Sequence, residues 1–301
     1  MSGAIVMNRY IYTLLNVLIA LTLFLQFGCG LSVKQRAAAQ TFSAATIDLA
    51  TLAEAEFTKS RADVIEMNTF RVKLGDDAVS LDKIDDYFTV DEVKQRVAAA
   101  NSLKRFGELL HTLVSSSQKE QLKIASDNFV TSLKTVRGVN LSDDQAGAIG
   151  SAVQIVGGLW IEYRRAQATR EAIAASFPFL MKLSQFIERD FDSKETHWFL
   201  GYQVSENALT NQADVVQSDD QVRKDELASL ALISEGRVIA KRNQTRFKAV
   251  STSITKAAKQ SRAALEELRK SLDCEEVPTQ DIQTFWANVK EAAIIFKALR
   301  N

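Results

Sequence analysis

Apolar residues recur along most of the chain at three- and four-residue spacing, which is the pattern of amphipathic α-helices. The pattern predicts helices over residues 42–74, 93–110, 122–136, 142–178, 179–216, 218–272 and 282–299. No strand–turn–strand pattern interrupts these segments. The predicted fold class is therefore all-α, an elongated antiparallel bundle of long amphipathic helices with one continuous core.

Few residues in the sequence can stop a helix. The chain has only two prolines, and we expect Pro178 to end or kink the helix that contains it. Gly75 is expected to follow the end of the first helix as a left-handed residue, and a further stop is expected near Gly138. The longest predicted helix, about 50 residues, would span roughly 75 Å.

The tetrapeptide Ser-Asp-Asp-Gln occurs twice, at residues 142–145 and 218–221. Its serine oxygen can accept from the backbone N–H three residues on, while the glutamine side chain reaches back to the serine N–H. The two aspartates suit the positive end of a helix dipole. Both copies are therefore predicted to be helix starts.

Apolar stripes predict which faces of two helices point to the core. In the long helix the stripe consists of Phe247, Val250, Ile254, Ala257, Ser261, Leu265, Leu268 and Leu272. In the last helix we expect Phe285, Val289 and Phe296 to face the core, and the stripe continues to Leu299.

The N-terminus differs from this amphipathic body. No residue from 10 to 33 is charged, Arg9 precedes the run, and Lys34 and Arg36 follow it. Such a run enters a bilayer as a helix, because backbone groups must pair internally there, and it is long enough to span. We therefore divide the chain into a signal peptide or membrane anchor, residues 1–29, and a helical bundle domain, residues 30–301.

The end of this segment resembles a bacterial lipoprotein signal, with a short basic start, an apolar run and Gly28 before Cys29. It departs from the usual pattern at Gln26, where a leucine is usual, and at Phe27, where a small residue is usual. The resemblance implies that Cys29 carries diacylglycerol and becomes the mature N-terminus. Membrane lipid is then a partner, and the protein is anchored on the extracytoplasmic, periplasmic side of the cell envelope.

Two other outcomes for the segment remain open. Gly28 and Gly30 are small enough for an ordinary signal cleaved before Leu31, which would release a soluble protein. Alternatively, the segment stays uncleaved as a helical anchor. Cations on both flanks leave the orientation of such an anchor undetermined.

Composition argues against a nucleic-acid partner and against stabilisation of the fold by disulfide bonds. Lys+Arg and Asp+Glu are equal at 37 each, so no global basic field exists to collect nucleic acid. The only other cysteine is Cys274, so no disulfide framework is expected once Cys29 is lipidated, removed or held in the membrane. The fold must then be stabilised by core packing.

Metal-binding and catalytic patterns are scarce. His111 lies on an apolar helix and is expected at a core or boundary position. Glu188, Asp192 and Glu195 share a helix face close to His197, and a solvated charged face is the favoured interpretation over a cation site. The sequence holds no nucleophile elbow, phosphate-binding loop or two-histidine zinc motif. We therefore predict a protein that is not an enzyme and that uses no cofactor or metal.

One uncharged segment, residues 146–161, is punctuated by glycines at Gly147, Gly150, Gly157 and Gly158 and ends near Trp160. Glycine inside a helix is unfavourable by up to about 1 kcal/mol relative to alanine, so these positions need a reason. The favoured reason is close approach of helices in a crowded core. The alternative is a membrane-inserting segment, with Trp160 at the interface.

These observations predict a membrane-tethered envelope protein with a binding or structural role, whose bundle contacts another protein or a second copy of itself. The alternative is a membrane-active, pore-forming-like protein that inserts residues 146–161.

Overall fold

The computed structural model describes residues 30–76, 79–85, 88–116, 118–154, 161–192, 197–217, 224–273 and 278–299. Over these residues it is helical and contains no strand, which confirms the all-α prediction. The helices are α2 (Val33–Lys73), the 3₁₀ helix η1 (Leu81–Lys83), α3 (Val90–Ser115), α4 (Lys119–Thr135), α5 (Asp143–Gln154), α6 (Ile161–Phe191), α7 (His197–Gln217), α8 (Lys224–Asp273) and α9 (Gln280–Ala298).

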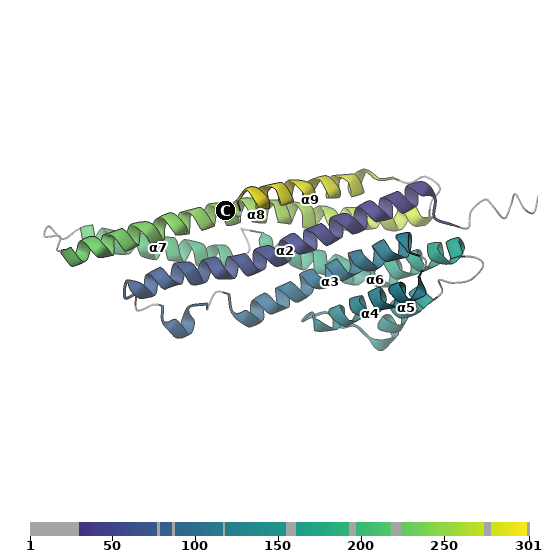
Figure 1. Ribbon diagram of the computed structural model, residues 1–301, viewed down its shortest axis with the longest axis horizontal. Helices are drawn as coiled ribbons and strands as arrows, with labels where there is room; N and C mark the ends of the chain where they lie inside the picture. Colours follow the sequence, from purple (N-terminus) through teal and green to yellow (C-terminus); the bar gives the residue numbers. More distant parts are fainter. Residues whose placement is uncertain are drawn as a thin grey trace, which may run out of the picture.

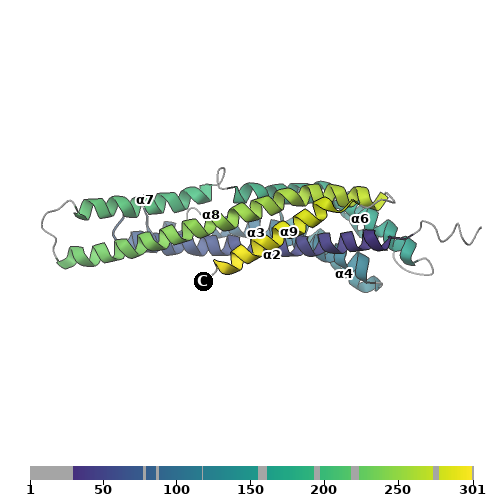
Figure 2. The same ribbon diagram turned by 90° about the horizontal axis from the view of Figure 1, so that it is seen from above.

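The helices form an elongated bundle (Figure 1). The helix α8 is 50 residues long, and α6 and α7 follow one another along it, while α2 and α3 pack as an antiparallel pair. The helix α9 lies along both α2 and α8 (Figure 2). The short helices α4 and α5 pack against α3 and α6 at one end of the bundle.

Local sequence sets both ends of α2. Ser32 and Gln35 form a capping box, in which each side chain accepts from the other residue's backbone N–H. The helix therefore begins at Val33, earlier than the predicted Phe42, because alanine-rich residues favour the helix without producing an apolar stripe. Its C-terminus is closed by Gly75, whose φ of +72° confirms the predicted left-handed position.

The capping box predicted at Ser142 is also confirmed. The Gln145 N–H donates to the Ser142 hydroxyl at 3.2 Å, and the Ser142 N–H donates to the Gln145 side chain at 3.0 Å. The helix α5 begins at the next residue, Asp143. The second copy, residues 218–221, lies outside the described residues, and α8 is described from Lys224 onward.

Of the two outcomes predicted for Pro178, the end of a helix is wrong, because α6 continues through it to Phe191, while the kink stays a prediction. Proline removes one N–H donor, which leaves the carbonyl of Ala174 without its intrahelical partner. Both Pro178 and Ala174 are exposed, so water can satisfy that carbonyl. The helix can accommodate Pro178 because this face is exposed to solvent. The spacing of apolar residues did not predict that exposure.

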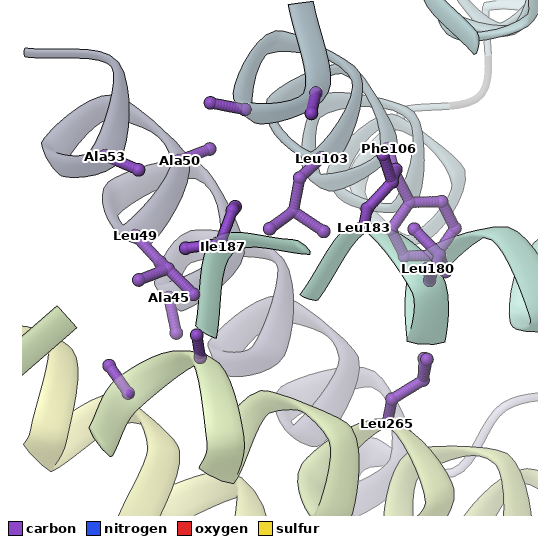
Figure 3. Close-up of a cluster of buried hydrophobic side chains, with 14 of the residues drawn as sticks. Ala45, Leu49, Ala50, Ala53, Leu103, Phe106, Leu180, Leu183, Ile187 and Leu265 are labelled. Carbon is purple, nitrogen blue, oxygen red and sulfur yellow. The ribbon is translucent and has the colours of Figure 1, made fainter. Parts of the chain in front are cut away.

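The core runs along the inside of the bundle and is built from alanine, leucine and phenylalanine. Figure 3 shows one part of it, where side chains from α2, α3, α6 and α8 meet. Every residue of the predicted α8 stripe, from Phe247 to Leu272, is buried, so that prediction is confirmed. In α9, Phe285 and Val289 are buried as predicted, but Phe296 is only half-buried and Leu299 is exposed.

The predicted signal or anchor segment, residues 1–29 with Cys29, lies outside the described residues. Within the described ranges, no helix combines the length and apolar character that a membrane crossing requires. The tether and the domain division therefore stay predictions.

Candidate functional site

The polar interior of the bundle centres on three charged side chains, Glu56 and Asp63 of α2 and Arg246 of α8, which we call the ionic cluster. Arg246 donates from one terminal nitrogen to the Glu56 carboxylate and from the other to the Asp63 carboxylate, each at 2.7 Å. Both carboxylates are fully buried and Arg246 is nearly so. The guanidinium therefore bridges two helices by charge-assisted hydrogen bonds in a region from which water is excluded.

Helix periodicity aims these groups at one another. Glu56, Ser60 and Asp63 are four and three residues apart, so they share one face of α2. The Ser60 hydroxyl donates to the Glu56 carboxylate at 3.2 Å. Arg246 precedes Phe247, a core residue, and this places its side chain on the edge of the buried stripe of α8.

Two further residues complete the surroundings of Asp63. Lys59 donates from its ammonium group to one carboxylate oxygen at 2.5 Å, and the Tyr202 hydroxyl of α7 lies 3.4 Å from the other. The Tyr202 ring also packs against Phe247, with 5.2 Å between ring centroids. The cluster therefore joins α2, α7 and α8.

Burial shifts the pKa values of this group. Burial raises the pKa of Glu56, and the hydrogen bond from Arg246 opposes that rise. Burial would lower the pKa of Arg246, but the hydrogen bond to Glu56 and the charges of Glu56 and Asp63 raise it above its ordinary value. Burial raises the pKa of Tyr202 well above its ordinary value, and the neighbouring carboxylates raise it further.

A second polar group continues along α2 beyond the cluster. The Asn68 amide donates to the carbonyl of Ile84 at 2.8 Å, and Arg71 donates to the Asp76 carboxylate at 2.7 Å. Asn68 and Arg71 are both buried. These contacts fasten the connection after α2 to the helix, so they have a structural explanation.

Two pockets open on the surface above the ionic cluster, at the last turn of α9. We call them together the α9 groove. One has a volume of about 550 Å³ and is lined by Lys59, Val238, Lys241, Arg242, Asn243, Thr245, Arg246, Ala298 and Leu299. The other has a volume of about 490 Å³ and is lined by Thr51, Glu54, Ala55, Thr58, Lys59, Ala62, Arg246 and Phe296. Lys59 and Arg246 line both pockets, so the groove lies directly over the cluster.

The structure places only some of the residues singled out from sequence. Cys29, Gly157, Gly158 and Trp160 lie outside the described residues. Gly147 and Gly150 are on α5, where an added Cβ would meet nothing within 4 Å. Among the described residues, the close-approach interpretation is therefore not supported for Gly147 and Gly150, because each position has room for a Cβ.

The other candidate groups have structural positions of their own. His111 is exposed, contrary to the expected core or boundary position, because its face of α3 is left to solvent. The Glu188 carboxylate is half-buried against the Arg262 guanidinium, so it belongs to an ion pair and not to a solvated face. Within the described ranges, no group of three or more potential metal ligands gathers.

Sequence reasoning missed the ionic cluster, although one signal was present. Glu56 and Asp63 continue the spacing of the apolar stripe that contains Leu49. A carboxylate at a stripe position must be paired when it is buried. The identity of the partner was not readable, because Arg246 is 190 residues from Glu56 in sequence.

Comparisons with protein-family models, with curated proteins and with solved structures gave no match to this chain, so its function is inferred from its own residues.

Proposed function

We propose that this protein is a membrane-tethered, extracytoplasmic binding protein without catalytic activity, and that the α9 groove is its binding site. The observation that carries the binding role is the position of Lys59 and Arg246, which line two adjacent pockets while holding the buried carboxylates beneath them. The buried carboxylates hold the charged groups of Lys59 and Arg246 in place before any ligand binds. Such a site is preorganised, and preorganisation lowers the entropy lost on binding.

Two features support a non-catalytic role for the groove. Its described lining contains no histidine and no cysteine, and its carboxylate, Glu54, stands without a second carboxylate in the lining. Acid–base and nucleophilic catalysis usually need such groups in pairs, within hydrogen-bonding distance of each other. The lysines and arginines present can bind and orient a ligand.

The sequence supports the tether. The uncharged run over residues 10–33 suits a bilayer, and Cys29 follows Gly28 as in a lipoprotein signal. The described part of the chain begins at Gly30, directly after this segment, and α2 follows from Val33. A tether would thus hold the bundle by the end of α2 that lies far from the groove.

The tether is tested by Cys29→Ala. A lipid anchor requires the cysteine sulfur, whereas a retained apolar helix does not. We expect the wild type to incorporate labelled palmitate, and the variant to lose the label and accumulate as an uncleaved precursor. A variant that fractionates as wild type at full length would indicate a helical anchor. A wild-type protein that is soluble and begins near Leu31 would overturn the tether.

The binding role is tested in cells by placing a photo-cross-linking amino acid at Thr58, which is exposed in the groove. Thr252, also exposed on a helix and outside the groove, is the matched control position. We expect an adduct from position 58 that is lost when Arg242→Ala is added, and no such adduct from position 252. Identical adducts from both positions would contradict a binding site in the groove.

A second candidate function, membrane activity of residues 146–161, is favoured by one observation. A Cβ added at Gly147 or Gly150 would meet no described atom within 4 Å, so close approach of helices does not explain these two glycines. Leakage of dye from vesicles containing phosphatidylglycerol, induced by the full chain and abolished in Gly157→Asp, would support this function. Equal leakage by the wild type and Gly157→Asp would exclude it.

A further inference from the structure

The larger pocket of the α9 groove has an uneven charge. Its ionisable lining residues are all cationic: Lys59, Lys241, Arg242 and Arg246. The carboxylates that pair with three of them lie outside the lining, since Asp63 and Glu56 are buried beneath the pocket and Glu206 is on α7. Among the described residues, the lining of the pocket therefore presents N–H donors and no carboxylate to anything that enters it.

Two arginines that line this pocket, Arg242 and Arg246, have N–H donors without an acceptor among the described residues. Arg242 is exposed, and no carboxylate is recorded beside it among the described residues. The Nε–H of Arg246 is buried and has no hydrogen-bond acceptor among the described residues, although both terminal nitrogens of the guanidinium are paired. A buried donor without an acceptor is unfavourable, but this Nε–H is closed off from solvent and cannot contact a ligand in the pocket. The exposed Arg242 is therefore the donor that is left for a ligand.

Beside the cations, the pocket is lined by the polar residues Asn243 and Thr245 and by an apolar group of three residues. Val238 is 66% exposed and Leu299 is 39% exposed, and both line the pocket beside Ala298. Such side chains would be covered by an apolar group next to the anion. The volume of about 550 Å³ falls within the range of small-molecule sites.

The position of the pocket along α2 bears on the source of the ligand. From Val33, where the helix begins, to Lys59 the helix advances by about 39 Å at 1.5 Å per residue. Charges on a bilayer are screened over about 8–10 Å at physiological salt. A bundle standing on its tether would therefore hold this pocket away from lipid headgroups, which favours a ligand free in solution.

We propose that this pocket binds a small acidic amphiphile, a carboxylate or phosphate group carried on a short apolar chain, free in the extracytoplasmic space. The anionic group accepts from Arg242 and Lys241, and the chain lies on Val238 and Leu299. This assignment rests on the proposed binding role of the α9 groove and names the chemistry that the groove selects.

Calorimetric titration of the full chain in phosphatidylcholine nanodiscs tests the assignment, with hexyl phosphate and hexanoate as probes. We expect saturable binding of at least one probe, and weaker binding of both inorganic phosphate and hexanol, because each lacks one half of the ligand. Arg242→Ala should weaken binding by roughly tenfold or more through loss of charge-assisted contacts. Lys248→Ala, an exposed cation outside the lining, should change it by less than about twofold.

A second pair of variants tests the apolar wall. Val238→Glu places a carboxylate in the pocket and should abolish binding, whereas Leu227→Glu, at another exposed apolar residue of α8, should leave it unchanged. All these side chains are exposed, so circular dichroism should show an intact helical fold.

Four results would overturn the assignment: no saturable binding of either probe, equal affinity for hexanol, no effect of Arg242→Ala, or loss of probe binding in phosphatidylglycerol nanodiscs. If phosphatidylglycerol nanodiscs abolish probe binding, the source of the anion is a lipid headgroup and the free-ligand assignment fails. The titration can fail while the cross-linking experiment still gives an adduct from position 58 that Arg242→Ala removes. That combination would overturn only the proposed ligand chemistry. Failure of both would overturn the binding role.

Discussion

The two halves of α2 are buried in different ways. Over residues 38–53 the buried side chains are mostly alanine, with Phe42 and Leu49, and the hydroxyls of Ser43 and Thr46 donate to carbonyls of their own helix. Over residues 56–71 the buried set includes side chains that need partners from elsewhere in the chain. These are Glu56, Asp63, Asn68 and Arg71.

The two halves of α2 therefore differ in role: the alanine-rich half contributes packing, and the polar half lies beneath the pockets. The alanine-rich half packs closely, because small side chains let backbones approach and need no polar partner. The polar half must find a counter-charge on α8 and a hydrogen-bond donor on α7, since an unpaired buried charge is strongly unfavourable. The pockets described on α2 all touch residues 58–62, so the surface suited to a ligand lies over the polar half.

The largest expected effect comes from removing the cation of the polar half. Arg246→Met leaves Glu56 and Asp63 buried and without their shared partner, so we expect the free energy of unfolding to fall by about 3–5 kcal/mol. Urea denaturation measures the loss. Leu49→Met in the alanine-rich half is the matched control, and should lose less than about 1.5 kcal/mol because volume is conserved.

A triple variant separates charge from packing at the cluster. Adding Glu56→Gln and Asp63→Asn to Arg246→Met removes the stranded charges, so we expect most of the lost stability to return. If Arg246→Met alone loses less than about 1 kcal/mol, water reaches the carboxylates and the polar half is not a dry interior.

The second prediction concerns α9, which covers both halves. Phe285 is fully buried, with its ring centroid 5.6 Å from that of Phe42, whereas Phe296 is half-buried beside the groove. Phe285→Ala should lower the free energy of unfolding by about 3–5 kcal/mol. Phe296→Ala should lower it by clearly less. Equal losses would mean that α9 is packed as firmly over the groove as over the alanine-rich half.

The third prediction tests the close packing of the alanine-rich half. A Cβ at Gly107 of α3 would lie 2.7 Å from Ile47 Cγ1 and 3.0 Å from the Ser43 carbonyl oxygen. Gly107→Ala should therefore destabilise the protein by about 1–3 kcal/mol. Gly147→Ala meets no neighbour and should stabilise it by about 0.5–1 kcal/mol, the ordinary gain inside a helix. Thermal unfolding of both variants would contradict the packing difference if the two shifts had the same sign.

The smallest effect at neutral pH is expected for Tyr202→Phe, because the hydroxyl lies 3.4 Å from Asp63 and the ring stays buried. The variant should lose at most about 1 kcal/mol near pH 7. The difference reverses with alkali. Burial raises the folded-state pKa of Tyr202 well above 10.0, so above pH 10 the unfolded state releases a proton that the native state keeps.

Stability of the wild type should then fall with rising pH by about 1.4 kcal/mol per pH unit more than that of the variant, until the folded-state pKa is reached. Parallel denaturation of the two proteins between pH 9 and pH 11 measures this slope difference. Parallel slopes would mean that Tyr202 titrates as an exposed phenol, and that the cluster is open to water.

The sequence alone determined the elements of this protein. Spacing of apolar residues predicted the long α8 stripe, and local chemistry predicted the Ser142 capping box and the left-handed Gly75. These features depend on residues within one or two helical turns, so a single segment carries the information. Where a segment had a weak stripe, as at the alanine-rich start of α2, the boundary was misplaced by several residues.

Only the tertiary structure decided which face of each helix meets which neighbour. Pro178 and Ala174 lie on an exposed face of α6, which lets the helix continue through the proline, and Gly147 lies where an added Cβ has room among the described residues. The pairing of Glu56 and Asp63 with Arg246 joins residues almost 200 positions apart, at a place where α7, α8 and α9 converge on α2. Charge pairing and pocket shape arise from how packed helices are arranged relative to one another, and no local pattern encodes that arrangement.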